Sequence, residues 1–362
     1  MTIPRELAEF ATGYGAGSFA VGRNRIINGA MEIDQRNAGA SVTPTADGLY
    51  SLDRWQYSIS QASKFSIQQN AGSVTPPTGY INYLGVTSLS AYSVISSDLF
   101  VIQQNIEGLN CSDLAWGTAN AATVTLSFWV RSSLTGTFGG SLRNNDSSRS
   151  YPFSFTISSS NTWEQKTITV AGDTTGTWLT TNGTGIRVTF SLGMGSTKSG
   201  TAGAWTAGSY WSPTGATSVV GTNGATFYIT GVQLEEGTVA TPFERRQYGQ
   251  ELALCQRYFA RLSSFATYTG FASGVVLNAT TGFVYLKYPV AARASPTISQ
   301  SNTANYDGSV IAAVTSIGTA YYGTDSLSAN VISSGGGLTT GRGCVLLGNN
   351  NTAAYINLSM EL

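Results

Sequence analysis

Apolar and polar residues alternate along several segments in the first two thirds of the chain, which is the pattern of half-buried β-strands. The clearest segment is ATVTLSFWVR, residues 122–131. Its apolar face is formed by Val124, Leu126, Phe128 and Val130. The same alternation returns in YPFSFTI (151–157) and GIRVTFSL (185–192), with the turn-rich segment RNNDSSRS (143–150) before the first of them. Alternating strands separated by such turns predict an antiparallel β-sandwich.

The last strand of this region, FYITGVQLEE (227–236), changes its apolar phase at a glycine. Phe227 and Ile229 share one face before Gly231, whereas Val232 and Leu234 are the apolar positions after it. A shift of one residue at a glycine predicts a β-bulge.

Two segments have a helical period instead. Ile3, Leu7 and Phe10 predict a short amphipathic helix, and the flexible connector ATGYGAGS follows it. The second segment spans residues 244–262, where apolar residues are spaced four, three, four and three apart. These residues are Tyr248, Leu252, Cys255, Phe259 and Leu262.

Strand patterns return after residue 263 and end in AAYINLSMEL, residues 353–362. The fold class is therefore predicted to be all-β, with a sandwich and then a second, smaller β domain. Short helical segments are expected at the N-terminus and at the junction. The predicted boundaries are 1–20 for an N-terminal segment, 21–243 for the sandwich, 244–262 for a helical junction and 263–362 for the C-terminal β domain.

Composition supports strands and loops and limits the partners. The 362 residues include 42 Gly, only 10% are charged, and 19 basic side chains balance 19 acidic ones. Because a nucleic-acid ligand requires a basic surplus, we expect no such partner. No apolar run is long enough to span a membrane, and Arg5, Glu6 and Glu9 stand where a signal peptide needs apolar residues. The three cysteines have no CxxC spacing and are expected to be buried free thiols of a protein made in a reducing cytoplasm.

Residue types also limit the chemistry. The chain has no His, which excludes a Ser-His-Asp triad, a Cys-His pair and His-ligated metals. The Gly-rich segments 13–18 and 334–343 lack the lysine of a phosphate-binding loop. Carboxylates alone can hydrolyse glycosides, but no spacing nominates a pair. We therefore expect no catalytic residues, no cofactor and no enzymatic activity.

Charge is concentrated in one window of 12 residues. It holds Glu235, Glu236, Glu244, Arg245 and Arg246. One hypothesis is that these charges hold the two domains, or neighbouring subunits, in register. The alternative is a solvated strand end and helix start, where Glu244 favours the helix N-terminus. Adjacent glutamates on a strand point to opposite faces, which does not suit a glycosidase pair.

Aromatic residues gather in a loop without alternation, AGAWTAGSYWS, residues 202–212. Flat rings stack on sugars, so Trp205, Tyr210 and Trp211 are predicted carbohydrate-binding platforms, with Trp178 as a weaker fourth. The alternative is that these rings close the end of the sandwich core or a subunit interface.

Five motifs taken together resemble a family of virion appendage proteins of tailed bacteriophages, identified as tail-fibre or receptor-binding proteins. They are NRIINGAMEIDQR (24–36), LDRW (52–55), TLSFWVR (125–131), FYITGVQLEEGTVATPFERR (227–246) and ELALCQRYF (251–259). The resemblance implies a jelly roll like that of carbohydrate-binding modules over residues 21–243, a homotrimer, and a place in the virion. It further implies adhesion to host surface glycans, and we expect the N-terminal segment to attach to other virion proteins. The alternative is a capsid decoration or head-fibre protein with a purely structural role.

Related jelly rolls often hold a structural calcium ion between a Glu of the first strand and an Asp pair of the last. Glu32 could match the first position, but the last strand has Thr230 and Gly231 where the Asp pair would be. We therefore expect no metal ion.

Overall fold

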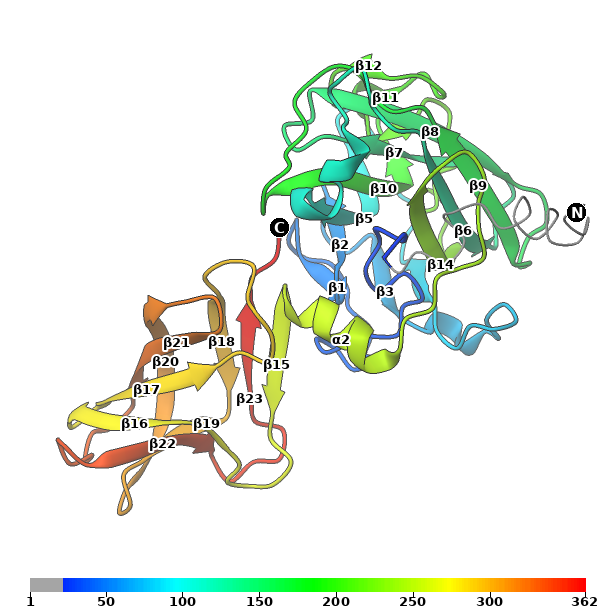
Figure 1. The fold of residues 1–362 in the computed structure, drawn as a ribbon. Coiled ribbons are helices and arrows are strands. Elements are labelled where there is room, and N and C mark those ends of the chain that lie inside the picture. Colours follow the sequence, from blue (N-terminus) through cyan, green and yellow to red (C-terminus); the bar gives the residue numbers. More distant parts are fainter. Residues whose placement is uncertain (1–21) are drawn as a thin grey trace, which may run out of the picture. The chain divides into compact units, whose positions relative to one another are not determined.

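The computed structural model describes residues 22–362, and these residues form two units (Figure 1). The first unit ends at Gln247 and the second begins at Tyr248, inside the predicted helical junction. The predicted N-terminal helix at Ile3–Phe10 and the attachment segment 1–20 lie outside the described residues. Nearly all regular elements are strands, which confirms the all-β prediction. No helix among residues 22–362 has the length and apolar character needed to cross a bilayer.

Two antiparallel sheets form the first unit. The larger sheet has the order β1 (Tyr50–Leu52), β2 (Trp55–Ile59), β5 (Leu99–Glu107), β10 (Thr184–Met194), β7 (Gly136–Arg143), β8 (Arg149–Ile157) and β12 (Thr206–Ala207). The smaller has the order β3 (Phe65–Gln69), β4 (Leu84–Ser88), β14 (Thr226–Glu236), β6 (Val124–Ser132) and β9 (Glu164–Val170). From β4 to β14 the chain passes repeatedly from one sheet to the other, which is the winding of a jelly roll.

Short elements lie in the loops between the long strands of the first unit. Two-residue strands β11 (Ser199–Gly200) and β13 (Ser212–Pro213) pair in parallel. Four 3-10 turns lie in the loops: η1 (Ala71–Ser73), η2 (Gly108–Asn110), η3 (Ser112–Leu114) and η4 (Ser196–Lys198).

The core lies between the two sheets, as the alternation predicted. Phe128 of β6 meets Phe155 of β8 and Phe190 of β10 edge to face, with ring centres 5.0 Å apart in both pairs. Such contacts contribute roughly 0.5–1.5 kcal/mol beyond the burial of apolar area. Val124 and Val188 are also fully buried. The inward positions of each strand thus fill one core, and the outward positions are left to form the two outer faces.

The bulge predicted at Gly231 is confirmed. The register between β14 and β6 shifts between Thr230 and Gln233, and Gly231 has a φ of +61°. A Cβ atom there would lie 2.6 Å from the Tyr80 hydroxyl oxygen. Both the left-handed backbone and the close approach of Tyr80 therefore favour glycine.

The second unit combines one helix, a three-stranded sheet and a closed six-stranded barrel. The helix is α2 (Tyr248–Gln256), and the sheet has the order β15 (Phe259–Ser263), β23 (Tyr355–Ser359) and β18 (Thr297–Ser301). The barrel runs β16 (Gly270–Asn278), β17 (Thr281–Lys287), β21 (Ser326–Ser333), β20 (Ile311–Tyr322), β19 (Thr303–Tyr306) and β22 (Gly343–Gly348).

The prediction of helix up to residue 262 is wrong at its C-terminal end. Phe259 and Leu262 belong to β15, where they pair with Ser359 and Ile356 of β23. Ala260 and Leu262 alternate toward the core of the second unit, so the strand buries them while its backbone gains a hydrogen-bonded partner. All three cysteines are buried free thiols, as predicted. Burial raises the pKa of the Cys111 thiol to about 12.

Candidate functional site

Two of the four predicted platform residues belong to a cluster of three tryptophans. Trp116, Trp178 and Trp205 meet edge to face, with ring centres 4.7 Å apart for Trp116 and Trp178 and 5.3 Å apart for the other two pairs. The indole N–H of Trp205 donates to the Ala171 carbonyl oxygen at 2.7 Å, and that of Trp178 to the Thr175 carbonyl oxygen at 3.1 Å.

This tryptophan cluster packs against the sandwich core. Trp116 is buried, and Trp178 and Trp205 are partly buried. The placement matches the alternative in which rings close the end of the core. Trp116, which stands outside the strand-like segments and carries no sequence signal, is the most buried ring of the cluster.

An open pocket of about 470 Å³ lies beside the cluster. Its lining consists of Ser199, Gly200, Thr201, Ala204, Trp205, Thr206, Tyr210 and Thr214. The Tyr210 ring lies so close to Gly200 and Gly208 that a Cβ atom on either would come within about 3 Å of it. Two glycines thus give the ring its place, and the hydroxyl groups of four Ser and Thr residues surround it. The pocket therefore combines one aromatic ring with several hydroxyl groups.

Trp211 points to a different neighbour, the guanidinium of Arg143. The guanidinium carbon lies 3.3 Å from the centre of the indole ring, which is a stacked cation–π contact. The Trp211 indole N–H donates to the Ser209 hydroxyl at 3.0 Å, and its backbone N–H donates to the Lys198 carbonyl oxygen at 2.8 Å. The ring is therefore fixed from three directions.

Arg143 lies on the outer face of the larger sheet, because the adjacent Leu142 faces the core. It has no exposed surface. Its side chain donates to the Gln103 amide oxygen at 3.1 Å, to the Thr189 hydroxyl at 3.3 Å and to the Ser147 hydroxyl at 3.1 Å. Trp211 is thus a partly exposed ring supported by a rigid polar layer. No sequence motif marks Arg143, which is the last residue of β7.

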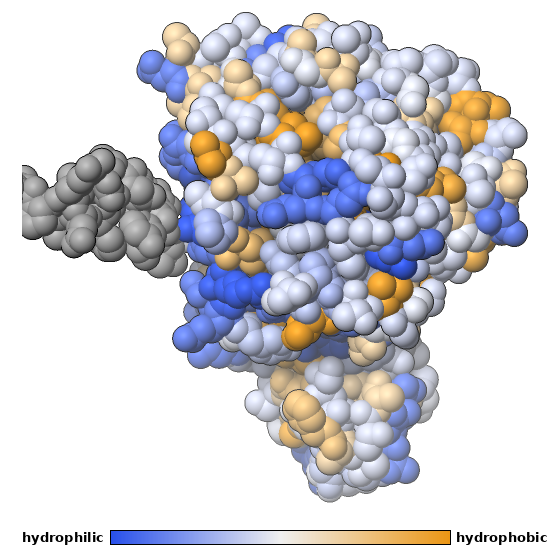
Figure 2. All heavy atoms as spheres, turned by 90° about the vertical axis from the view of Figure 1, so that its right-hand side faces the viewer, coloured by the Kyte–Doolittle hydropathy of each residue, from blue (hydrophilic) through white to orange (hydrophobic). Residues whose placement is uncertain are grey.

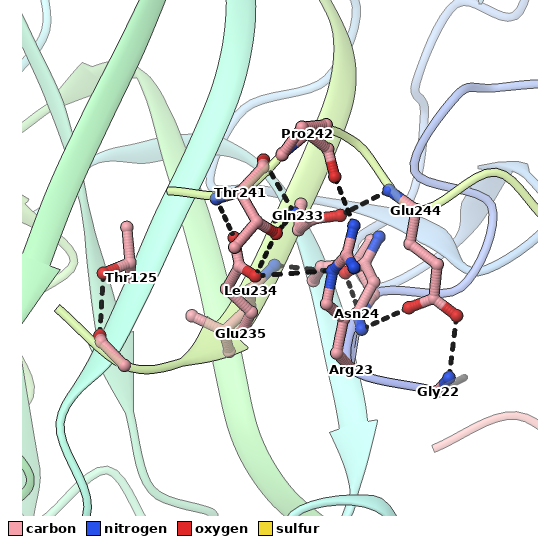
Figure 3. Close-up of polar contacts among 12 residues, drawn as sticks. Gly22, Arg23, Asn24, Thr125, Gln233, Leu234, Glu235, Thr241, Pro242 and Glu244 are labelled. Atoms are coloured by element: carbon pink, nitrogen blue, oxygen red, sulfur yellow. Dashed lines mark hydrogen bonds and ion pairs between the residues drawn. The ribbon is translucent and has the colours of Figure 1, made fainter. Parts of the chain in front are cut away.

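The charged stretch forms a network inside the first unit (Figure 3). The Glu235 carboxylate is almost fully buried and lies 3.5 Å from Arg23 Nε. It accepts hydrogen bonds from the Thr241 backbone N–H at 2.8 Å, from the Thr241 hydroxyl at 2.6 Å and from the Gln233 amide at 2.8 Å. Four donors thus surround this carboxylate.

Glu244 and Arg246 hold the same N-terminal segment. The Glu244 carboxylate accepts from the backbone N–H groups of Gly22 and Asn24, both at 2.7 Å (Figure 3). The Arg246 guanidinium donates to the Ile26 carbonyl oxygen at 3.1 Å and lies 3.7 Å from Glu244. We call the contacts of Glu235, Glu244 and Arg246 with residues 22–26 the clasp.

The other two charged residues of the stretch lie apart from the clasp. The Arg245 guanidinium stacks on Tyr80, with its central carbon 4.7 Å from the ring centre, and Glu236 is exposed. The charged stretch therefore connects residues 22–26, at the start of the jelly roll, to β14 and to the residues that follow it. Arg23 and Asn24, the partners on the other side, lie about 200 residues away in sequence, and no local pattern indicates them.

The sequence predicted no metal site, on the basis of Glu32 and of Thr230 and Gly231 in β14. Residues 22–362 contain no group of three or more Cys, Asp or Glu side chains that could hold a metal ion.

One face of the molecule is mainly polar. Figure 2 shows a face on which polar and neutral residues predominate and apolar residues form small separate groups. β9 lies near the right-hand edge of the first unit in Figure 1, and its residues alternate between partly buried and exposed positions.

Comparison with known proteins gives only distant structural neighbours. No protein-family model matches the chain, and no curated protein matches it. The enzymatically active domain of tailspike protein 4 of bacteriophage CBA120 aligns with 59% of this chain at 11% identity and a TM-score of 0.32. The alignment spans only 21% of that domain.

Carbohydrate-binding modules align over their whole length. A module of family 4 covers 58% of this chain and 98% of its own, at 15% identity and a TM-score of 0.30. The family 61 module TmCBM61, solved with β-1,4-galactotriose, covers 59% and 99%, at 11% identity and a TM-score of 0.29. These TM-scores lie below 0.5, so the assignment of the sandwich rests on the sheets of this chain.

Proposed function

We propose that this chain is a virion protein of a tailed bacteriophage, a tail-fibre or receptor-binding protein that adheres to host surface glycans without catalysis. The observation that carries the glycan-binding part is the Trp211 ring, fixed on the outer face of the jelly roll next in sequence to the Tyr210 pocket. The phage origin is supported by the motifs at residues 24–36 and 227–246. The absence of His from the sequence supports binding over catalysis.

Binding would use the exposed side of the Trp211 ring. The C–H face of a sugar stacks on such a ring, and the separate pocket of the preceding residue, Tyr210, offers the hydroxyl groups of Thr201 and Thr214 for hydrogen bonds. Because the ring is already fixed by Arg143 and Ser209, little side-chain entropy is lost on binding. A single shallow site of this kind is expected to bind with a dissociation constant of about 1 mM, which corresponds to about −4 kcal/mol.

The proposal includes a homotrimer, which multiplies weak sites. In addition to the family resemblance, it is supported by uncharged side chains on the outer face of the barrel. These are Val275, Leu277, Tyr285, Tyr321 and Ile332, all of them exposed in the single chain. An apolar face of this kind is typical of protein contacts. Linked copies raise avidity by about a hundredfold or more when all of them reach the same surface.

The test is adsorption of purified protein to host cells or to arrayed host glycans. Trp211→Ala should abolish adsorption while the jelly roll stays folded, with a loss of stability limited to the roughly 2 kcal/mol of the contact with Arg143. Trp205→Ala should instead destabilise the jelly roll by about 3 kcal/mol, because it opens the tryptophan cluster.

Trp163→Ala is the matched control. Trp163 lies beside β9 on the smaller sheet, also partly buried, with its indole N–H bonded to the Thr75 carbonyl oxygen at 2.9 Å. The Trp163→Ala variant should adsorb as strongly as the wild-type protein. Normal adsorption by a folded Trp211→Ala variant would contradict the proposal and favour the alternative, a capsid decoration or head-fibre protein. The packed tryptophan cluster is the observation that keeps this structural role open.

A further inference from the structure

Two arginines stand next to each other on the outer face of the larger sheet. Arg143 of β7 and Arg187 of β10 are direct cross-strand partners, and Arg187 pairs with Asn105 of β5 on its other side. Cross-strand partners have Cβ atoms about 5 Å apart, so two guanidinium groups extend from neighbouring points of one face. Like charges placed in this way repel each other.

Neither arginine has an acidic partner among the described residues. The hydrogen-bond partners of Arg143 are the neutral side chains of Gln103, Ser147 and Thr189. Arg187 makes no hydrogen bond or ion pair with residues 22–362, and its Nε is buried without a partner. Burying a cation without a counter-ion costs several kcal/mol. The fold retains this cost in full at Arg143 and in part at the partly exposed Arg187.

The nearby acids are engaged elsewhere. Glu107, on the same face of β5, pairs in register with Thr184 and not with Arg187. Asp173 forms a two-pronged ion pair with Arg149, at 2.7 and 2.9 Å. Asp146, in the turn after β7, accepts from the Ser148 backbone N–H at 3.0 Å. No carboxylate among residues 22–362 therefore forms an ion pair with either guanidinium.

Aromatic rings lie on both sides of the pair. Trp211 covers Arg143 with its ring centre 3.3 Å from the guanidinium carbon. On the other side, β1 brings Tyr50 to the outer face next to Gln56, and the Arg36 guanidinium stacks on the Tyr50 ring at 4.8 Å. Burial lowers the pKa of Arg187, and the nearby Tyr50 phenol acts in the opposite direction. We call Arg143, Arg187, Trp211 and Tyr50 the arginine row.

We propose that the arginine row binds an anionic sugar, with the sugar ring stacked on Trp211 and its carboxylate or phosphate group on the guanidinium of Arg187. A guanidinium presents several N–H donors in a plane that matches either anion. Arg187 is partly exposed and its terminal N–H groups make no hydrogen bond with residues 22–362, whereas Arg143 is sealed under Trp211 and contributes charge and support. This inference rests on the proposed glycan-binding function and specifies the class of glycan.

The test is an array of bacterial capsular polysaccharides and lipopolysaccharide fragments. Each glycan is printed in three forms: untreated, carboxyl-reduced and dephosphorylated. The full-length wild-type chain should bind untreated acidic glycans about tenfold to a hundredfold more strongly than the form that lacks the anion, as expected for charge-assisted hydrogen bonds. The treatment that abolishes binding tells carboxylate from phosphate.

Variants locate the anion on the protein. Arg187→Met keeps the aliphatic stem and should lose the preference for acidic glycans without a lower melting temperature. Arg131→Met is the matched control, since Arg131 lies on β6 of the other sheet and donates to the Asn161 carbonyl oxygen at 2.9 Å. It removes the same charge and should keep the preference.

The outcomes separate the two proposals. Wild-type protein that binds neutral and acidic forms equally would overturn the anionic ligand and leave the glycan-binding function standing. Wild-type protein that binds no glycan at all would overturn both. If the Arg187→Met variant still prefers acidic glycans, the anion binds at a site other than the arginine row. The comparison of treated and untreated glycans needs only wild-type protein, so it holds even if a variant fails to fold.

Discussion

The indole of Trp211 and the guanidinium of Arg143 fix each other. The ring excludes water from a cation that has no exposed surface, and the cation holds the ring flat on the sheet. A cation–π contact of this kind contributes roughly 2 kcal/mol when desolvated, which offsets only part of the cost of burying an unpaired charge. Residues retained at a net cost to stability are expected at functional sites.

At the residue scale, Arg187 should therefore lower stability. Arg187→Met removes a partly buried cation that lacks a partner, so we expect the free energy of unfolding to rise by about 1 kcal/mol. Arg149→Met is a matched control with the opposite sign, because it leaves the buried Asp173 carboxylate without its ion pair. Urea unfolding of both variants measures the difference. A clear loss of stability in Arg187→Met would mean that the guanidinium contributes favourable contacts.

The sequence could not predict which ring of the 202–212 loop packs against the core and which stacks on Arg143. The loop has no alternation, so nothing local separates Trp205 from Trp211. The placement of Trp205 depends on Trp116 and on the Ala171 carbonyl oxygen, which come from other parts of the chain. Long-range contacts decide which ring joins the tryptophan cluster and which stacks on Arg143.

At the element scale, β14 depends on the glycine at its bulge. Gly231→Ala should destabilise the jelly roll by about 1–3 kcal/mol, because its φ is +61° and the new Cβ would meet the Tyr80 hydroxyl oxygen at 2.6 Å. Gly224→Ala is the control, with a φ of +74° and no atom within 4 Å of the new Cβ. The difference between the two variants in thermal unfolding isolates the clash. Equal effects would show that Tyr80 moves aside.

The clasp makes a second prediction about β14. Glu235→Ala should destabilise the first unit by about 3–5 kcal/mol, because it leaves Arg23, Gln233 and Thr241 without their shared acceptor. The neighbouring Glu236→Ala removes an exposed carboxylate and should change stability by less than about 0.5 kcal/mol. Guanidinium unfolding compares them. Similar small effects would indicate that water replaces the carboxylate and that the stretch is a solvated strand end.

Element types were predictable where a single period was strong. Alternation located β6, β8 and β10, and the phase change located the bulge in β14. The end of α2 was not predictable, because Phe259 and Leu262 fit the helical period while Ala260 and Leu262 fit the strand period. Pairing with β23, about 100 residues later, decides between them. The clasp escaped prediction for the same reason, since its two sides are far apart in sequence.

At the scale of the whole molecule, composition indicated an all-β chain, and the change of pattern near residue 250 indicated two parts. Closure of the barrel was not indicated. It depends on pairing of β22 with both β16 and β19, and neither pairing leaves a local signal. The outer face of the barrel follows from that closure, because alternate residues of each strand then have no core to enter.

The outer face of the barrel makes the last prediction, which concerns the assembled protein. If Leu277 and Tyr321 lie in subunit contacts, the double variant Leu277→Glu/Tyr321→Glu should separate the subunits by charge repulsion and desolvation cost. The mass measured by light scattering should then fall from about three times 38.0 kDa to the mass of one chain. Affinity for a soluble oligosaccharide should stay the same, whereas adsorption to cells should drop about a hundredfold, because the sites are no longer linked.

The double variant Thr315→Glu/Ser316→Glu is the control, because it adds the same charge at exposed positions of β20 and should leave the mass unchanged. A trimer that survives the first substitution would place the contacts elsewhere, and monomers that still adsorb fully would show that avidity is not required.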